Sequence, residues 1–239
     1  QYPQGVVDDI VGIAKIATDA QINCHVDACM GGVTFAYLER LGEKIAPWNL
    51  QVPGVSSISV DLHKFGYTSK GASVIMYASK HLRSYQGFVT NDWLGGMYGS
   101  SGVLGTKSGG SMASAWAVMH FLGDDGYLRL TRQAREATLQ LASVIRDSTE
   151  LILGAKPEST LLCFGAQDPT VLNVFAVADE LSKRGWYVDR QTPPDSLHCT
   201  VNAIHHDKIE WFANDLRNSV ETVLSQRLTG NVSAYGTVE

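Results

Sequence analysis

Short apolar runs alternate with amphipathic segments along the first third of the chain. The pattern predicts helices over residues 8–21 and 31–42, and buried strands over residues 22–28 and 55–61. A third apolar run, residues 72–79, follows too soon for a helical crossover, so we expect it to pair antiparallel with the run before it. Because strands that alternate with helices form a largely parallel sheet, the sequence predicts an α/β fold.

The pattern changes after the third apolar run. Residues 80–110 are rich in loop formers, and residues 111–122 and 127–148 have the periodicity of long helices. Farther along, short strands and helices are interleaved as in an antiparallel α+β domain. Strands are predicted over 159–166, 186–191 and 197–204, and helices over 170–185 and 206–226.

These changes divide the chain into three parts. We expect residues 1–125 to belong to a large α/β domain, residues 126–150 to form a connecting helix, and residues 151–239 to form a small α+β domain. The last stretch, residues 227–239, reads as a polar tail or a partner-contacting extension.

Composition excludes several classes of protein. The net charge of −5 gives no basic field for nucleic acid, no apolar run reaches the length of a transmembrane helix, and no signal peptide opens the chain. Cys24, Cys29, Cys163 and Cys199 form no CxxC pair, which favours a reducing, cytoplasmic setting. Since the chain opens inside an amphipathic pattern without a methionine, we expect further residues upstream.

Two predicted strands end in chemically active residues. Asp27 ends the first strand and Lys64 directly follows the second, and the residues between them leave room for one helical crossover. The carboxyl ends of parallel strands meet at one edge of a sheet, so we expect the two side chains to lie close together. A lysine amine can form a Schiff base with the aldehyde of pyridoxal 5′-phosphate, while a carboxylate can keep the pyridine nitrogen protonated.

Groups that could bind a phosphate lie nearby in the sequence. His63 directly precedes Lys64 and could donate to the cofactor phosphate. The glycine-rich segment 102–110 supplies backbone N–H groups and the hydroxyls of Thr106 and Ser108, next to a predicted helix N-terminus.

Other interpretations compete with this one. Taken singly, a lysine at a strand end is typical of a solvated surface residue, and an aspartate there is typical of a turn. His25, Asp27 and Cys29 alternate along the first predicted strand and would share a face, as three ligands of a zinc or iron site would. No distal pair of ligands with matching spacing appears. The cofactor interpretation is therefore favoured over a plain buried strand, and both over a metal site.

The motifs, taken in order, resemble those of one enzyme family. "HVDACMGG", "GVSSISVDLHKFGYTSKGASVIMY", "DWLGGMYGSSGVLGTKSGG" and "HFLGDDGY" are similar to segments of the sphingosine-1-phosphate lyases. These enzymes belong to the group II decarboxylase-like branch of fold-type I pyridoxal phosphate enzymes. The resemblance implies a large domain with a mainly parallel sheet that binds pyridoxal 5′-phosphate, followed by a small α+β domain.

The resemblance also implies roles for individual residues. Lys64 would be the Schiff-base lysine, Asp27 the partner of the pyridinium nitrogen, and His63 a neighbour of the cofactor phosphate. Cys29 would lie behind the cofactor ring. Lys70 would lie near the site, as a candidate for the substrate phosphate or for proton transfer.

The same resemblance implies a dimer. Gly105 and Thr106 match a segment that reaches the phosphate of the neighbouring subunit's cofactor, so the implied assembly is a homodimer with shared active sites. The chain has Lys107 where these lyases usually carry arginine. Lysine lacks the planar guanidinium group with which arginine can bind a phosphate through two nitrogens. The amino-terminal half of the family, with its phosphate loop and ring-stacking residue, is absent from the 239 residues.

The implied activity is retro-aldol cleavage of a phosphorylated sphingoid base to a long-chain aldehyde and phosphoethanolamine. An amino acid decarboxylase with the same cofactor is the alternative enzyme. A third interpretation is a cofactor-fold remnant that serves only dimerisation or partner binding.

Overall fold

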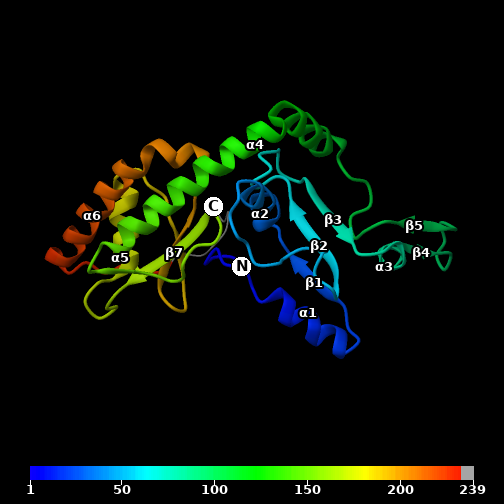
Figure 1. Cartoon of the computed structure of the whole chain (residues 1–239), viewed down its shortest axis with the longest axis horizontal. Helices are drawn as coiled ribbons and strands as arrows, with labels where there is room; N and C mark the ends of the chain where they lie inside the picture. Colours follow the sequence, from blue (N-terminus) through cyan, green and yellow to red (C-terminus); the bar gives the residue numbers. More distant parts are fainter. Residues whose placement is uncertain (233–239) are drawn as a thin grey trace. The chain divides into compact units, whose positions relative to one another are not determined.

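A computed structural model describes residues 1–232 of the chain. It divides into two compact units, which we describe separately (Figure 1). The mixed-sheet unit comprises Val7–Gly126, and the antiparallel-sheet unit comprises Gln1–Val6 together with the residues from Tyr127 onward. No helix within residues 1–232 combines the length and apolar character that a membrane span requires.

The mixed-sheet unit is built on three strands flanked by two helices. Its main elements, in chain order, are α1 (Ile10–Asp19), β1 (Cys24–Asp27), α2 (Gly31–Arg40), β2 (Val55–Asp61) and β3 (Ser73–Tyr77). The sheet order is β1-β2-β3, with β1 parallel and β3 antiparallel to β2. The predicted helices and strands, and the antiparallel third strand, are confirmed in this region.

The two faces of this sheet differ in polarity. Val26, Ile58 and Val60 are buried in one cluster with apolar residues of α1 and α2. The opposite face carries polar side chains that are exposed or half-buried: His25, Asp27, Ser57, Ser59 and Asp61. The prediction of buried strands therefore holds for one face of the sheet, and the other face is polar because alternate positions in both strands carry polar side chains.

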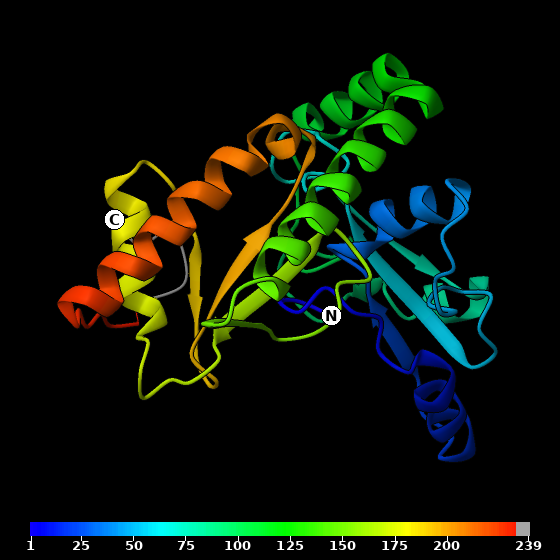
Figure 2. The same ribbon diagram turned by 60° about the vertical axis from the view of Figure 1, so that its left-hand side comes forward.

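Helix α2 packs closely against strand β2. Gly32 lies in the first turn of this helix, and a β-carbon at this position would lie 2.6 Å from a methyl group of Val60. The absence of a side chain therefore allows the helix to begin directly after β1 and to cover the apolar face. Figure 2 shows this helix beside the strands from a second direction.

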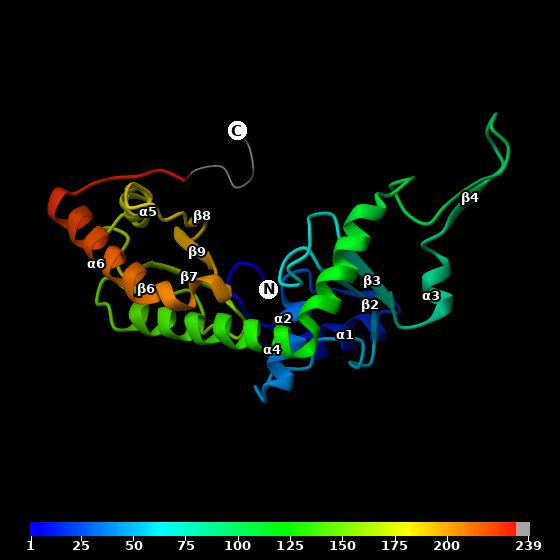
Figure 3. The same ribbon diagram turned by 90° about the horizontal axis from the view of Figure 1, so that it is seen from above.

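Residues 80–110 contain short elements that the sequence pattern does not predict. They are α3 (Lys80–Ser84) and a two-stranded ribbon of β4 (Phe88–Thr90) and β5 (Tyr98–Ser100). Figure 3 shows this ribbon extending away from the three-stranded sheet. Elements of three to five residues have too few positions for a periodic pattern to form.

A long helix follows this region. Helix α4 runs over Gly109–Arg146 and is interrupted at Gly123, where φ is 55° and ψ is −173°. Such a backbone conformation is accessible almost only to glycine. The two predicted helices, 111–122 and 127–148, correspond to the two sides of this interruption.

The antiparallel-sheet unit contains a four-stranded sheet in the order β6-β7-β9-β8. Its elements after α4 are β6 (Leu151–Leu153), β7 (Leu161–Ala166), α5 (Val174–Lys183), β8 (Asp189–Gln191), β9 (Ser196–Thr200), the 3₁₀-helix η1 (Ala203–Lys208) and α6 (Ile209–Gln226). Phe164 and Leu197 are fully buried against residues of α4, α5 and α6. This arrangement confirms the antiparallel α+β pattern. Most of the tail predicted over 227–239 lies outside the described residues.

The first residues of the chain complete this second unit. The carbonyl of Gly5 accepts hydrogen bonds from the backbone N–H groups of Glu158 at 2.8 Å and Ser159 at 3.0 Å. The carbonyl of Pro3 lies 2.9 Å from Nδ1 of the buried His198, whose ring packs edge-on against Tyr2. These contacts place Gln1–Val6, which we call the N-terminal segment, in the antiparallel-sheet unit.

Candidate functional site

Lys64 lies in the turn that follows β2, at the carboxyl end of the strand. Its Nζ donates to Sγ of Cys29 at 3.0 Å and lies 2.9 Å from Oδ2 of Asp61. Burial works to lower the pKa of this amine, but the bonds to Cys29 and Asp61 outweigh it and hold the pKa above its ordinary value. In this arrangement Lys64 is a positioned cation.

Asp27 ends β1 and faces the same edge of the sheet. Its Oδ1 accepts from the backbone N–H of Cys29 at 3.0 Å and from Oγ of Ser59 at 3.3 Å. Burial works to raise the pKa of Asp27, but these hydrogen bonds and the charge of Lys64 together lower it. The carboxylate is therefore ionised at neutral pH, and the expected proximity of Asp27 and Lys64 is confirmed.

Asp61 is a member of this site that the sequence argument did not include. Besides its ion pair with Lys64, it accepts a hydrogen bond from Oγ of Ser73 on β3. Its side chain is only 17% exposed, and the bonds from Ser73 and Lys64 overcome the effect of burial and lower its pKa. The sequence did contain an indication of this role, because Asp61 is the last residue of the strand and its position shares a face with positions 57 and 59.

Cys29 lies in the turn after β1, between the two charged partners. Burial raises the pKa of its thiol above the ordinary value, although the hydrogen bond from Lys64 acts in the opposite direction. The side chain is therefore a neutral thiol at pH 7 and a weak nucleophile.

His25 belongs to a hydrogen-bonded network on the polar face. Its ring nitrogens lie 2.8 Å from Oγ of Ser57 and 3.2 Å from Oγ of Ser59, and Ser59 in turn donates to Asp27. Cys29 lies beyond the end of β1, so the three residues of the alternative metal site do not continue one strand. Within residues 1–232, no group of three His, Cys, Asp or Glu side chains is arranged to hold a metal ion.

His63 lies beside the charged cluster. Its Nδ1 hydrogen-bonds the carbonyl of Ala72 at 2.8 Å, and its Nε2 lies 3.8 Å from Oδ2 of Asp61. Because the carbonyl can only accept, Nδ1 carries a proton, and Nε2 could donate to a phosphate oxygen only in the doubly protonated ring.

The remaining predicted site residues lie outside this cluster of contacts. Lys70 is exposed in the turn between β2 and β3, and Gly105 and Thr106 are exposed in the segment before α4. None of the three makes a hydrogen bond or ion pair with Asp27 or Lys64 in the part of the chain that the structure describes. Their assigned roles remain predictions.

The contacts of Asp27 and Lys64 fit the chemistry of pyridoxal 5′-phosphate. The group needs an ionised carboxylate for its ring nitrogen and a primary amine for its aldehyde, and the ends of β1 and β2 supply both on a polar face that is accessible. The amine is held by Cys29 and Asp61 rather than by Asp27 itself. The carboxylate of Asp27 is therefore not paired with Lys64 and can pair with another cation, such as a protonated ring nitrogen.

Comparison with known proteins agrees with this chemistry. The model of the pyridoxal-dependent decarboxylase conserved domain matches residues 3–167. A sphingosine-1-phosphate lyase of Arabidopsis thaliana is 36% identical over 222 residues, which are 93% of this chain and 40% of that protein. The chain thus spans less than half the length of this curated relative.

Two solved structures extend the comparison to the fold. A sphingosine-1-phosphate lyase of Burkholderia pseudomallei is 35% identical and superimposes with a TM-score of 0.85 over 92% of this chain and 50% of that one. A glutamate decarboxylase of Lactobacillus brevis has a TM-score of 0.77 over 93% of this chain and 53% of that one, at 18% identity. The second match concerns the fold alone.

Proposed function

The chain belongs to the pyridoxal-dependent decarboxylase family, and from this premise we propose that it is part of a pyridoxal phosphate-dependent aldehyde lyase. The substrate would be a phosphorylated sphingoid base such as sphingosine 1-phosphate, cleaved between two carbon atoms to a long-chain aldehyde and phosphoethanolamine. The observation that carries the proposal is the placement of ionised Asp27 and of the Lys64 amine at adjacent strand ends, where both contact Cys29. The identity to lyases of this substrate supports the choice of reaction.

Asp27 would act through its charge. Its carboxylate is held by the N–H of Cys29 and the hydroxyl of Ser59, so it keeps both its orientation and its ionisation without a change of the backbone. Facing the ring nitrogen, it would keep that nitrogen protonated. The bound cofactor supplies an electron sink for the carbon–carbon cleavage.

The amine of Lys64 would hold the cofactor and would also transfer protons. Asp61 and Cys29 orient the amine, and Asp61 also provides a carboxylate 2.9 Å away that stabilises the protonated form. After cleavage Lys64 would return a proton to the nitrogen-bearing carbon of the substrate. His63 would approach the cofactor phosphate through Nε2, and Cys29 would lie behind the ring.

We also propose that two copies of the whole protein form a homodimer with shared sites. Gly105 and Thr106, exposed in the described chain, would then serve the cofactor phosphate of the partner, and Lys70 would take the substrate phosphate or a proton. The four free cysteines support a reducing compartment such as the cytoplasm.

The test combines a spectrum with chemical trapping. The whole protein, incubated with pyridoxal 5′-phosphate, is expected to absorb in the visible range, and borohydride should fix the cofactor to the peptide that carries Lys64. Lys64→Ala should lose both signals and at least about a thousandfold in turnover. A colourless wild-type protein that borohydride does not label would exclude the proposal.

Substrate assays separate the lyase from a decarboxylase. A lyase should convert a phosphorylated long-chain amino alcohol to an aldehyde and leave glutamate and aromatic amino acids unchanged. Release of carbon dioxide from an amino acid, with no cleavage of the phosphorylated base, would instead favour the decarboxylase. Thr106→Ala mixed with Lys64→Ala should regain activity in verified mixed dimers if sites are shared.

A further inference from the structure

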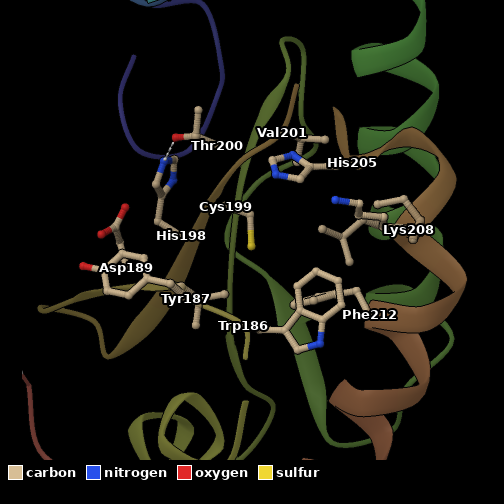
Figure 4. A pocket seen from close by; sticks show the side chains of 13 residues that line it. Trp186, Tyr187, Asp189, His198, Cys199, Thr200, Val201, His205, Lys208 and Phe212 are labelled. Carbon is tan, nitrogen blue, oxygen red and sulfur yellow. Dashed lines mark hydrogen bonds between the residues drawn. The ribbon is translucent and has the colours of Figure 1, made fainter. Parts of the chain in front are cut away.

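The antiparallel-sheet unit contains a cavity of about 250 Å³ that involves none of the residues of the candidate site. It lies between β9, the stretch before β8, η1 and the start of α6 (Figure 4). Its apolar lining includes Leu141, Trp186, Val188, Val201 and Phe212. The volume is sufficient for a ligand with one aromatic ring.

The aromatic floor of this cavity is held in place by one contact between its own rings and one hydrogen bond to a residue that does not line it. The rings of Trp186 and Phe212 meet edge to face with centroids 5.1 Å apart. Nε1 of Trp186 donates to Oδ2 of Asp215 at 2.7 Å, which fixes the indole from the far side. The floor is therefore preformed and does not have to be ordered by a ligand.

Two nitrogen donors face the space above this floor. Nδ1 of His205 accepts from the backbone N–H of Asn202 at 3.1 Å, so in the neutral ring the proton is on Nε2. The amine of Lys208 points into the same space in Figure 4. Within residues 1–232, neither Nε2 of His205 nor Nζ of Lys208 has a hydrogen-bonding or ion-pair partner.

Among the lining residues that the structure describes, Asp189 is the only one with a carboxylate. It is opposite His198 in the sheet, and its carboxylate lies beside that ring in Figure 4. Cys199, whose sulfur points into the cavity, has a pKa raised to about 12 by burial and is a neutral thiol. Helix α6 also begins at the cavity and directs the positive end of its dipole there.

We propose that this cavity binds a small carboxylate with an aromatic body. The aromatic ring would lie on Trp186 and Phe212, and the carboxylate would accept from Nε2 of His205 and from Nζ of Lys208. Because all these groups belong to the antiparallel-sheet unit, the inference is independent of the proposed lyase activity.

The probe is 3-phenylpropionate, titrated into the whole protein and followed by saturation-transfer NMR. Its uncharged counterpart, 3-phenylpropionamide, has the same ring and chain and should bind at least fivefold more weakly. Lys208→Gln should weaken binding of the carboxylate about fivefold to tenfold and leave binding of the amide unchanged. Lys183→Gln is the matched control, because Lys183 is paired with Glu180 on α5 and does not line the cavity.

A second variant tests whether the probes bind inside this cavity, by filling part of its volume. Cys199→Leu places additional carbon atoms inside the cavity and should abolish binding of both probes, with folding checked by circular dichroism. If this variant does not fold, the Lys208→Gln titration alone decides. Equal affinity for carboxylate and amide, or binding that Lys208→Gln leaves unchanged, would overturn the proposal.

Discussion

The two units of this chain bury their apolar side chains to different extents. In the antiparallel-sheet unit, residues such as Phe164, Leu181 and Leu197 are completely buried between one sheet and three helices. In the mixed-sheet unit, Ile75 and Met76 of β3 are each more than 40% exposed in the described chain.

The difference shows that packing and chemistry are organised separately. The antiparallel-sheet unit closes a core of its own. The mixed-sheet unit has a smaller core on one face of its sheet, and its polar face holds the candidate site. Asp27, Asp61 and Lys64 are positioned by hydrogen bonds and charges rather than by apolar contacts.

The largest expected effect on stability comes from the closed core. Phe164→Ala removes a fully buried ring and should lower the free energy of unfolding by about 3–5 kcal/mol. Ile75→Ala, at a 43% exposed position, is the matched change and should cost less than about 1 kcal/mol. Urea unfolding followed by circular dichroism measures both. Similar losses for the two variants would contradict the comparison.

An intermediate effect on stability is expected from the ion pair of Asp61 with Lys64. Asp61→Asn keeps the shape of the side chain but removes its ion pair with Lys64, and should destabilise the fold by about 1–2 kcal/mol at pH 7. In an assay of the proposed lyase activity, the same change should reduce turnover by the whole protein, because Lys64 loses one of the two groups that orient its amine.

This effect should depend on pH in a defined direction. The folded state lowers the pKa of Asp61 below its ordinary value of 3.8, so ionised Asp61 stabilises the fold above about pH 5, and this contribution is lost as the pH falls from about 4 through the lowered pKa of the folded state. The stability difference between wild type and Asp61→Asn should shrink over that range. A constant difference from pH 7 to pH 3 would show that the ion pair is not its source.

The smallest effect concerns a rate of modification. Burial raises the pKa of Cys29, so iodoacetamide should alkylate it at pH 8 more slowly than it alkylates free cysteine. Mass spectrometry of peptides gives the rate, and the urea-unfolded protein is the control. Labelling of Cys29 at the rate of the unfolded chain would argue against the contacts of its thiol with Lys64 and Asp27.

Part of this arrangement could be predicted from the sequence. The apolar runs around β1 and β2 indicate two strands, and the placement of Asp27 and Lys64 follows from the position of the strand ends. The contacts of Asp61 could not be derived in this way, because they depend on β3 placing Ser73 opposite it in antiparallel register. Register between strands far apart in sequence is a tertiary property.

The ribbon of β4 and β5 and the cavity are two further features that could not be predicted from the sequence. Three-residue strands are below the length at which periodicity is informative. The cavity combines Leu141 of α4 with side chains that lie between Trp186 and Phe212, far along the chain. The tautomer of His205 follows from the cap at Asn202, which requires the local backbone conformation. The sequence contains these residues but does not indicate that they meet.

The docked N-terminal segment has a consequence for how such chains can recombine. Because Gln1–Val6 belong to the antiparallel-sheet unit, that unit is assembled from two separate stretches of the described chain, with Val7–Gly126 between them. A single genetic crossover near residue 127 would therefore transfer the four-stranded sheet without the N-terminal segment, which contacts His198 and the backbone N–H of Ser159.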